Sequence, residues 1–266
     1  MNKQPFNEKK STSNHTTDKK NKKKSFGFKK FFLALLTLFI VVFLGVGCGL
    51  VAIGLDGDKD VSDIHPPASS QILDMNGNLI TNIHATENRT LVTLDKIPAN
   101  LQNAFIAVED NRFYEHNGID PRGIFRAIYS NLTSGEVAEG GSTITQQLAK
   151  NAFLSQDRTF KRKIQEFFIA LRLERQYTKE EILEMYLNQI YFGRGAYGVQ
   201  AAAQTYFGKD VSQLDLSECA MLAGIPRSPN YYSPLNNLGA ANERKAEVLD
   251  QMVKYGYIDS TTAAKL

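Results

Sequence analysis

An acidic cluster follows an apolar stretch near the middle of the chain. Residues 108–118 (VEDNRFYEHNG) hold three acids, an Arg and a His directly after Ile106 and Ala107. Because Glu109 adjoins apolar residues, we expect its carboxylate to be partly removed from water, which suits a group that accepts a proton. The alternative is a solvated helix end whose charges form ordinary surface pairs.

A polar stripe is predicted for residues 140–150 (GGSTITQQLAK). At helical spacing one face carries a hydroxyl, two amides and an ammonium group, and the opposite face is apolar. The polar face consists of Thr143, Gln146, Gln147 and Lys150. These groups suit sugar hydroxyls and a phosphate, and the glycine pair precedes a free helix amino terminus where an anion can dock. The alternative is a surface helix, although this face lacks the acids that usually accompany Lys.

A third cluster of charges lies in residues 162–166 (RKIQE). Arg162 and Glu166 are four residues apart on one helical face, a spacing that most often gives a modest contact of about 0.2–0.5 kcal/mol. The functional alternative is that Arg162 and Lys163 bind phosphate while Glu166 holds or polarises a reacting group. The spacing by itself fits both interpretations.

Helix start and stop signals predict that the elements around these clusters are mainly α-helical. One expected helix follows Asp120 and Pro121 and turns Ile124, Ile128 and Leu132 inward. Ser142 is the expected cap of the next helix. The other predicted helices are 98–109, 160–176, one opened by a Thr178/Glu181 capping box, 199–207, one between Asp215 and Pro226, 241–255 and 258–266. Asn76-Gly77 within 69–81 predicts a short β-hairpin before them.

The amino-terminal part has a different composition. Residues 1–30 hold ten Lys and two acids, a charge of +8, and are predicted to be a disordered basic tail. Residues 31–55 contain no charge and are long enough to cross a bilayer as one helix. A cleaved signal peptide or a lipoprotein site at Cys48 fits less well, because the run is too long and Leu is missing three places upstream of Cys48.

The charges that flank the apolar run predict its orientation. Five Lys lie within ten residues before it, whereas Asp56, Asp58 and Asp60 with a single Lys follow it. The amino end is therefore expected inside the cell, and the linker 56–66 and the domain 67–266 outside. The chain after residue 30 has a net charge of −5, so it offers no basic surface of the kind that binds nucleic acid. Cys219 is the one cysteine beyond the apolar run, so the outer domain has no internal disulfide.

Five motifs resemble, in order, those of family 51 glycosyltransferases, the domain of class A penicillin-binding proteins and monofunctional transglycosylases. They are EDNRFYEHNG (109–118), GGSTITQQLAKN (140–151), RKIQE (162–166), ILEMYLNQIYFGRGAYGVQAAAQTYFGK (182–209) and AMLAGIPRSPNYYSP (220–234). The resemblance covers about residues 67–266. It implies a lysozyme-like helical domain with a membrane-dipping subdomain and a substrate, lipid II, that carries undecaprenyl pyrophosphate.

The resemblance also implies roles for individual residues. Glu109 matches the catalytic base that takes the proton from the acceptor's GlcNAc 4-hydroxyl, whose oxygen attacks the anomeric carbon of the growing strand's MurNAc with inversion. Lys150, Arg162 and Lys163 would stabilise the departing pyrophosphate, and Glu166 matches the second essential carboxylate. Positions that line the cleft in relatives are Asp110, Phe113, His116, Ser142, Thr143, Gln146 and Gln147.

Cofactors and partners are less constrained. No His/Cys ligand cluster is present, so no metal site is predicted, and any Mg or Mn ion would arrive with the substrate's pyrophosphate. Lipid II, the growing glycan strand, the membrane and proteins of the division or elongation machinery are the expected partners. A glycan hydrolase with two carboxylates and a non-catalytic, membrane-tethered binding module remain alternatives. No Ser-x-x-Lys or Lys-Thr-Gly transpeptidase motif occurs, which fits a monofunctional enzyme or a fragment.

Overall fold

A computed structural model describes residues 36–37, 70–73, 75, 79–83, 88–134, 140–154 and 159–266. The chain divides into two compact units, 1–49 and 50–266, and all elements discussed below belong to the second. The predicted basic tail, linker and membrane span lie outside the described residues, except Leu36 and Thr37 of the span. Within the described residues, no helix is long and apolar enough to cross a membrane.

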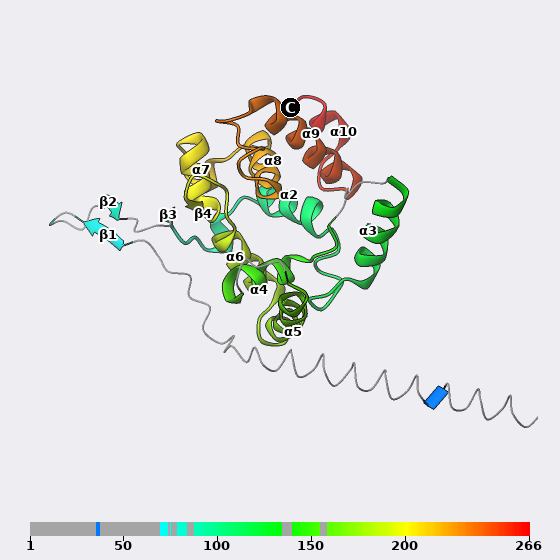
Figure 1. Ribbon diagram of the computed structural model, residues 1–266. Coiled ribbons are helices and arrows are strands. Elements are labelled where there is room, and N and C mark those ends of the chain that lie inside the picture. The colour runs from blue at the N-terminus through cyan, green and yellow to red at the C-terminus, as the bar shows by residue number, and fades with distance from the viewer. Residues whose placement is uncertain are drawn as a thin grey trace, which may run out of the picture. The chain divides into compact units, whose positions relative to one another are not determined.

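The second unit is mainly helical (Figure 1). Its α-helices are α2 (Ala99–Glu109), α3 (Pro121–Ser134), α4 (Ile144–Phe153), α5 (Phe160–Gln176), α6 (Lys179–Gln189), α7 (Val199–Phe207), α8 (Leu216–Gly224), α9 (Leu238–Lys254) and α10 (Ser260–Ala263). The short 3-10 helix η1 (Leu94–Lys96) precedes α2, and η2 (Val211–Gln213) and η3 (Ile225–Arg227) flank α8.

The sequence signals for helix ends act as predicted in most places. Thr178 and Glu181 form the predicted capping box of α6, and the Asp215 side chain caps α8. Gly208 ends α7 in the left-handed conformation, with a φ of 67°. The prediction that Ser142 caps α4 is wrong, because Thr143 is the N-cap and forms a full capping box with Gln146.

Strands are a minor part of the unit. The strand β1 (Ser70–Leu73) pairs antiparallel with β2 (Leu79–Ile83), with Ser70 opposite Ile83. Asn76 and Gly77, the predicted hairpin turn, lie outside the described residues. A short parallel pair joins β3 (Asn88–Arg89) to β4 (Ala196–Tyr197), which ties the segment before α2 to the loop before α7.

The core forms around α2, which packs against α8 and α9, while α4 packs against α5 and α6. Phe105 on α2 is fully buried and meets Tyr186 of α6 and Phe192 edge-on, with ring centroids 5.9 and 6.1 Å apart. Glu109 at the end of α2 therefore follows directly from a helix that is fixed on several sides.

Helix α3 differs from the prediction, because, of the three residues expected to face inward, Ile124 is half-buried and the other two are exposed. Ile128 is 51% exposed and Leu132 79% exposed, and Phe125 and Tyr129 are exposed as well. The buried side of α3 instead carries small residues, Gly123 and Ala127. Helical spacing establishes that one face is apolar, but it does not establish what covers that face.

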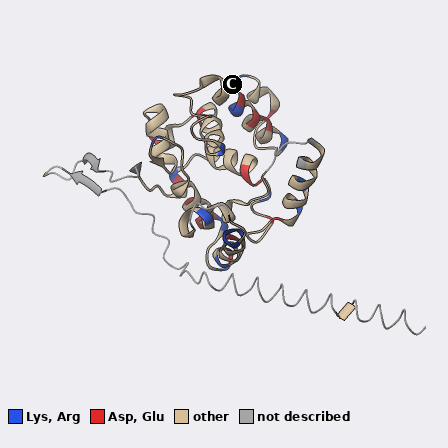
Figure 2. Cartoon of the chain, in the orientation of Figure 1, with Lys and Arg blue, Asp and Glu red and all other residues tan. Residues whose placement is uncertain are grey.

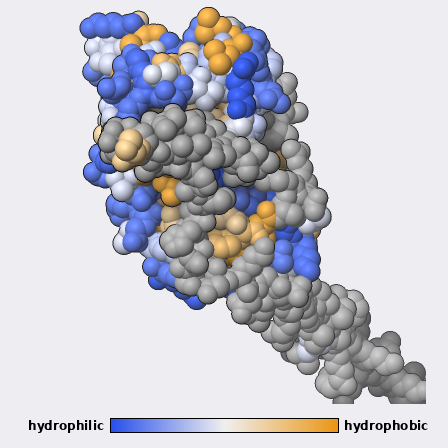
Figure 3. Space-filling model, turned by 90° about the vertical axis from the view of Figure 1, so that its left-hand side faces the viewer, coloured by the Kyte–Doolittle hydropathy of each residue, from blue (hydrophilic) through white to orange (hydrophobic). Residues whose placement is uncertain are grey.

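Figure 3 shows the left-hand side of the view in Figure 1, away from α3. On this side hydrophilic side chains surround separate hydrophobic patches.

Candidate active site

Glu109 is the last residue of α2 and is half-buried, as its apolar neighbours predicted. Its Oε2 accepts a hydrogen bond of 2.7 Å from Nε2 of Gln147 on α4. No other described residue donates a hydrogen bond to this carboxylate. One oxygen is thus held by an amide while the other remains available to a ligand.

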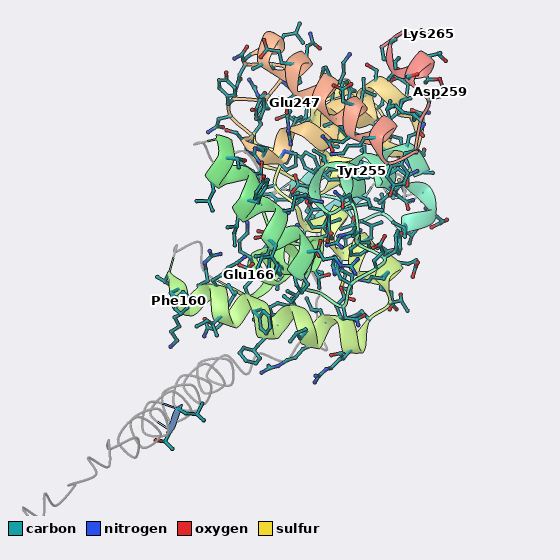
Figure 4. The ribbon with its side chains drawn as sticks, turned by 90° about the vertical axis from the view of Figure 1, so that its right-hand side faces the viewer. Phe160, Glu166, Glu247, Tyr255, Asp259 and Lys265 are labelled. Carbon is teal, nitrogen blue, oxygen red and sulfur yellow. The ribbon has the colours of Figure 1, made fainter. Side chains whose placement is uncertain are left out.

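A polar cavity of about 350 Å³ adjoins Glu109. It lies between the end of α2 and helices α3 and α9, and Figure 4 shows Glu247 and Tyr255 on the α9 side. Its lining comprises Ala107, Val108, Glu109, Asp110, Asn111, Arg126, Ser130, Gly140, Arg227, Arg244, Glu247, Asp250, Gln251 and Tyr255. The size and polarity suit a sugar unit, and the contribution of α9 was not predicted from the sequence.

Asp110 holds the start of α4 and the loop after α2 together. It is 7% exposed, and its Oδ2 accepts a 3.0 Å hydrogen bond from the backbone N–H of Ile144, the first residue of α4. Both carboxylate oxygens also lie 3.0 Å from Nε2 of His116. Asp110 and His116 thus hold the backbone next to Glu109 in place, and their own side chains are almost completely buried.

The predicted polar stripe on α4 divides into two parts. Thr143 and Gln146 are 2% and 3% exposed, and their side chains close the capping box at the helix start. Thr143 Oγ1 also donates to the carbonyl of Gly118 at 2.6 Å. The prediction of a free amino terminus for an anion is therefore wrong, because this box and the Asp110 carboxylate already occupy it. Gln147 and Lys150 are the members that face the site.

Glu166 on α5 gathers the cations of the site. It is 2% exposed, and it forms ion pairs with Lys163 and, at 3.5 Å, with Arg162. The Lys163 ammonium group also donates to Ser142 Oγ at 2.8 Å. Figure 2 shows Lys and Arg along α5, and in Figure 4 Glu166 lies on the side of α5 that faces the rest of the unit.

Lys150 lies within electrostatic range of both Glu109 and Glu166. It is partly buried, and its ammonium group forms no hydrogen bond or ion pair with the described residues. Burial lowers its pKa, and Arg162 and Lys163 lower it further, although Glu166 and Glu109 act in the opposite direction. A cation without a close partner, near two others, favours an anionic ligand.

Phe113 is fully buried and contributes packing, with no surface exposed to a ligand. The ammonium group of Lys179 lies 4.5 Å from the centre of its ring and also pairs with Glu174 at 2.8 Å. Thr145 Oγ1 donates to the same Glu174 oxygen at 2.6 Å. This second charge cluster was missed, because Glu174 and Lys179 belong to different helices and no local spacing connects them.

The structure brings most of the predicted residues to one place. Glu109, Asp110, Ser142 and Thr143 line one small hollow, and Ser142 connects that hollow to Lys163. Two further side chains were missed by sequence reasoning: Tyr186, whose hydroxyl contacts Gln147, and Arg244 of the cavity. Both lie in ordinary helical patterns, so no sequence signal identifies them. Among the described residues, no group of three or more His, Cys, Asp or Glu is arranged to hold a metal ion.

A helical unit with one carboxylate beside a polar cavity and a second carboxylate among cations has the elements of a glycosyl-transferring site. The family model described as Transglycosylase matches residues 76–253, and the chain belongs to this family. It is 46% identical to penicillin-binding protein 1F of Bacillus subtilis over 88% of this chain and 33% of the relative. It is 48% identical to penicillin-binding protein 1A of Escherichia coli over 87% of this chain and 27% of the relative.

The chain thus spans about a third of the length of these curated relatives. Among solved structures, penicillin-binding protein 1A from Haemophilus influenzae aligns with 76% of this chain and 20% of its own. That alignment has 28% sequence identity and a TM-score of 0.44.

Proposed function

We propose that this chain is a peptidoglycan glycosyltransferase that polymerises lipid II into β-1,4-linked glycan strands. The observation that carries the proposal is the pairing of two differently surrounded carboxylates. Glu109 keeps one oxygen free beside a polar cavity, and Glu166 lies among Arg162 and Lys163 with Lys150 nearby. Membership of the transglycosylase family supports the same reaction.

In this proposal Glu109 is the general base. Its free oxygen takes the proton of the acceptor's GlcNAc 4-hydroxyl, and the resulting oxygen attacks the anomeric carbon of the growing strand's MurNAc. The bond to undecaprenyl pyrophosphate breaks, and the anomeric configuration inverts. The Gln147 hydrogen bond of 2.7 Å supports this role, because it fixes the position of the carboxylate through one oxygen and leaves the other for the acceptor.

Lys150, Arg162 and Lys163 stabilise the departing pyrophosphate in this proposal. Its negative charge grows in the transition state, where fixed cations lower the barrier most. Lys150 lacks a close partner in the described residues, and the cluster at Glu166 is held in place by ion pairs. A glycan hydrolase has no charged lipid leaving group, so this cluster favours the transferase over that alternative.

The unit works at a membrane surface in this proposal. Residues 31–55 form a single span with the amino end inside, and the site lies outside the cell membrane. The exposed apolar side chains of α3, among them Phe125 and Leu132, would dip into the lipid. Such an arrangement keeps the catalyst near a lipid-linked substrate and raises its effective concentration.

No resident cofactor is part of the proposal. The residues of the site offer cations for a pyrophosphate and no described cluster of metal ligands, so a Mg or Mn ion would travel with the substrate. Proteins of the division or elongation machinery are the proposed macromolecular partners.

The test is polymerisation of labelled lipid II by the detergent-solubilised 266-residue chain, with products separated on a gel. Wild type should give a ladder of strands, and Glu109→Gln should lower the rate by about 10²- to 10⁴-fold, since it removes the base. Lipid II binding should persist in the variant. Polymer yield that is unchanged in Glu109→Gln would contradict the role of Glu109. Release of fragments from preformed glycan would favour a hydrolase, and binding without polymer would favour a binding module.

A further inference from the structure

Tyr186 is a buried polar side chain that the proposed mechanism does not yet use. It lies on α6, is fully buried, and packs edge-on against Phe105 of α2 at an interplanar angle of 82°. Phe105 precedes Glu109 by one helical turn. The packing therefore fixes the Tyr186 ring relative to the end of α2 that presents Glu109.

The Tyr186 hydroxyl reaches Glu109 through one amide. It donates to Gln147 Oε1 at 3.4 Å, and Gln147 Nε2 donates to Glu109 Oε2 at 2.7 Å. Burial, together with the charges of Glu109 and Asp110, raises the pKa of Tyr186 well above its usual value. The phenol keeps its proton at working pH and acts as a donor.

The direction of this chain of hydrogen bonds matters, because an amide can present either its oxygen or its nitrogen. With the hydroxyl donating to Oε1, the amino group of Gln147 must face the Glu109 carboxylate. The reversed amide would place its oxygen against that carboxylate, and two acceptors would then meet without a proton between them. The Tyr186 hydroxyl and the Glu109 carboxylate thus favour the same amide orientation, the one in which Gln147 donates to Glu109.

We propose that Tyr186 is a positioning residue for glycan polymerisation, which acts through Gln147 to hold Glu109 with one oxygen bonded and the other free. This inference rests on the proposed function, because it assigns Tyr186 to the base of that reaction. The three residues come from α6, α4 and α2, so the hydrogen-bonded chain makes the base depend on the mutual packing of three helices.

The test variant is Tyr186→Phe, which removes the hydroxyl and keeps the ring. Because the bond to Gln147 is long, its loss should lower kcat for lipid II polymerisation by about threefold to tenfold. KM should stay within about twofold of wild type, since no substrate contact is removed. A merely structural role of Tyr186 would leave kcat intact in the fraction of protein that remains folded.

Tyr206→Phe is the matched control. Its hydroxyl is also buried and donates to the carbonyl of Phe192 at 2.7 Å, and it forms no hydrogen bond with Gln147 or Glu109. It should lose thermal stability while keeping kcat. In a Gln147→Ala background, the further change Tyr186→Phe should have little effect on kcat, because the link to Glu109 is already absent.

The outcomes separate the two proposals. Equal kcat for wild type, Tyr186→Phe and Tyr206→Phe, with wild type active, would overturn the positioning role and leave the proposed function intact. Additive losses in the Gln147→Ala background would also overturn it. A wild-type chain that binds lipid II without polymerising it would overturn both.

Discussion

Glu109 and Glu166 are both carboxylates on helices of the same site, yet their surroundings are opposite. Glu109 is half-buried, and among the described residues its hydrogen-bond partner is the neutral amide of Gln147. Glu166 is 2% exposed and is paired with Lys163 and Arg162. A carboxylate with a free oxygen can receive a proton, whereas one that is saturated by cations holds those cations in place. In the proposed mechanism, the difference in partners, more than the difference in position, separates the base Glu109 from the positioning group Glu166.

Glu166→Gln tests this comparison with the largest expected effect. The change leaves Lys163 and Arg162 without their common partner, so kcat should fall by about 100-fold through misplaced cations, and KM should change by less than about threefold. Initial polymerisation rates at several lipid II concentrations measure both. Glu218→Gln, which removes the partner of Lys209 in another ion pair, is the control and should retain wild-type rates. If Glu166→Gln matched this control, the positioning role of Glu166 would be wrong.

Lys150→Met sharpens the comparison on the cation side. The substitution keeps much of the side-chain volume and removes one charge, so kcat/KM should fall by about tenfold to 100-fold, as for a lost hydrogen bond to a charged group. The control is Lys161→Met, because Lys161 is an exposed lysine on α5. This variant should keep nearly the wild-type kcat/KM. Equal losses in both variants would show that general positive charge matters and that Lys150 has no specific role.

Asp120→Asn extends the comparison to the loop that follows Glu109. Its expected effect is on stability, and it is the smallest of the effects predicted for these variants. Burial opposes the ionised form of Asp120, but hydrogen bonds from Arg112 and the Gly123 backbone outweigh it and lower the pKa. Asp120 therefore stabilises the fold above its ordinary pKa, and this stability is lost as pH falls through the lower folded-state pKa. The variant should lose about 1–3 kcal/mol at neutral pH.

Urea unfolding of wild type and Asp120→Asn at a series of acidic pH values measures this loss. The difference in free energy of unfolding between the two proteins should become smaller as the pH falls below the usual pKa range of Asp. The exposed Asp95 supplies the control Asp95→Asn, for which a small difference is expected. If the free-energy difference between wild type and Asp120→Asn stayed constant down to low pH, the stabilisation would not come from an ionised Asp120.

Much of the fold could be predicted from local signals. The bounds of α5, 160–176, and of α7, 199–207, follow from caps and glycines that act within one turn of the helix. The exposure of Ile128 and Leu132 could not be predicted, because it depends on what packs against α3. The Thr143 cap shows the same limit on a smaller scale, since Ser142 and Thr143 are both good caps and contacts with Gly118 and Asp110 favour Thr143.

The site shows a similar division. The i,i+4 relation of Arg162 and Glu166 is local, and the structure confirms their ion pair. The contact between Gln147 and Glu109 joins residues 38 positions apart, and that between Tyr186 and Gln147 joins residues 39 apart. Spacing along one helix carries no information about such contacts. The pattern on α4 therefore did not predict that Thr143 and Gln146 close the helix end.

The isolated ammonium group of Lys150 also has a consequence for the stability of the free protein. Because burial lowers its pKa, the charged form destabilises the folded chain below that folded-state pKa, and the penalty fades as pH rises toward the ordinary value for Lys. An anion that binds there removes the same penalty. In the proposed function Lys150 contacts the substrate's pyrophosphate, and relief of this penalty contributes to the affinity for that group.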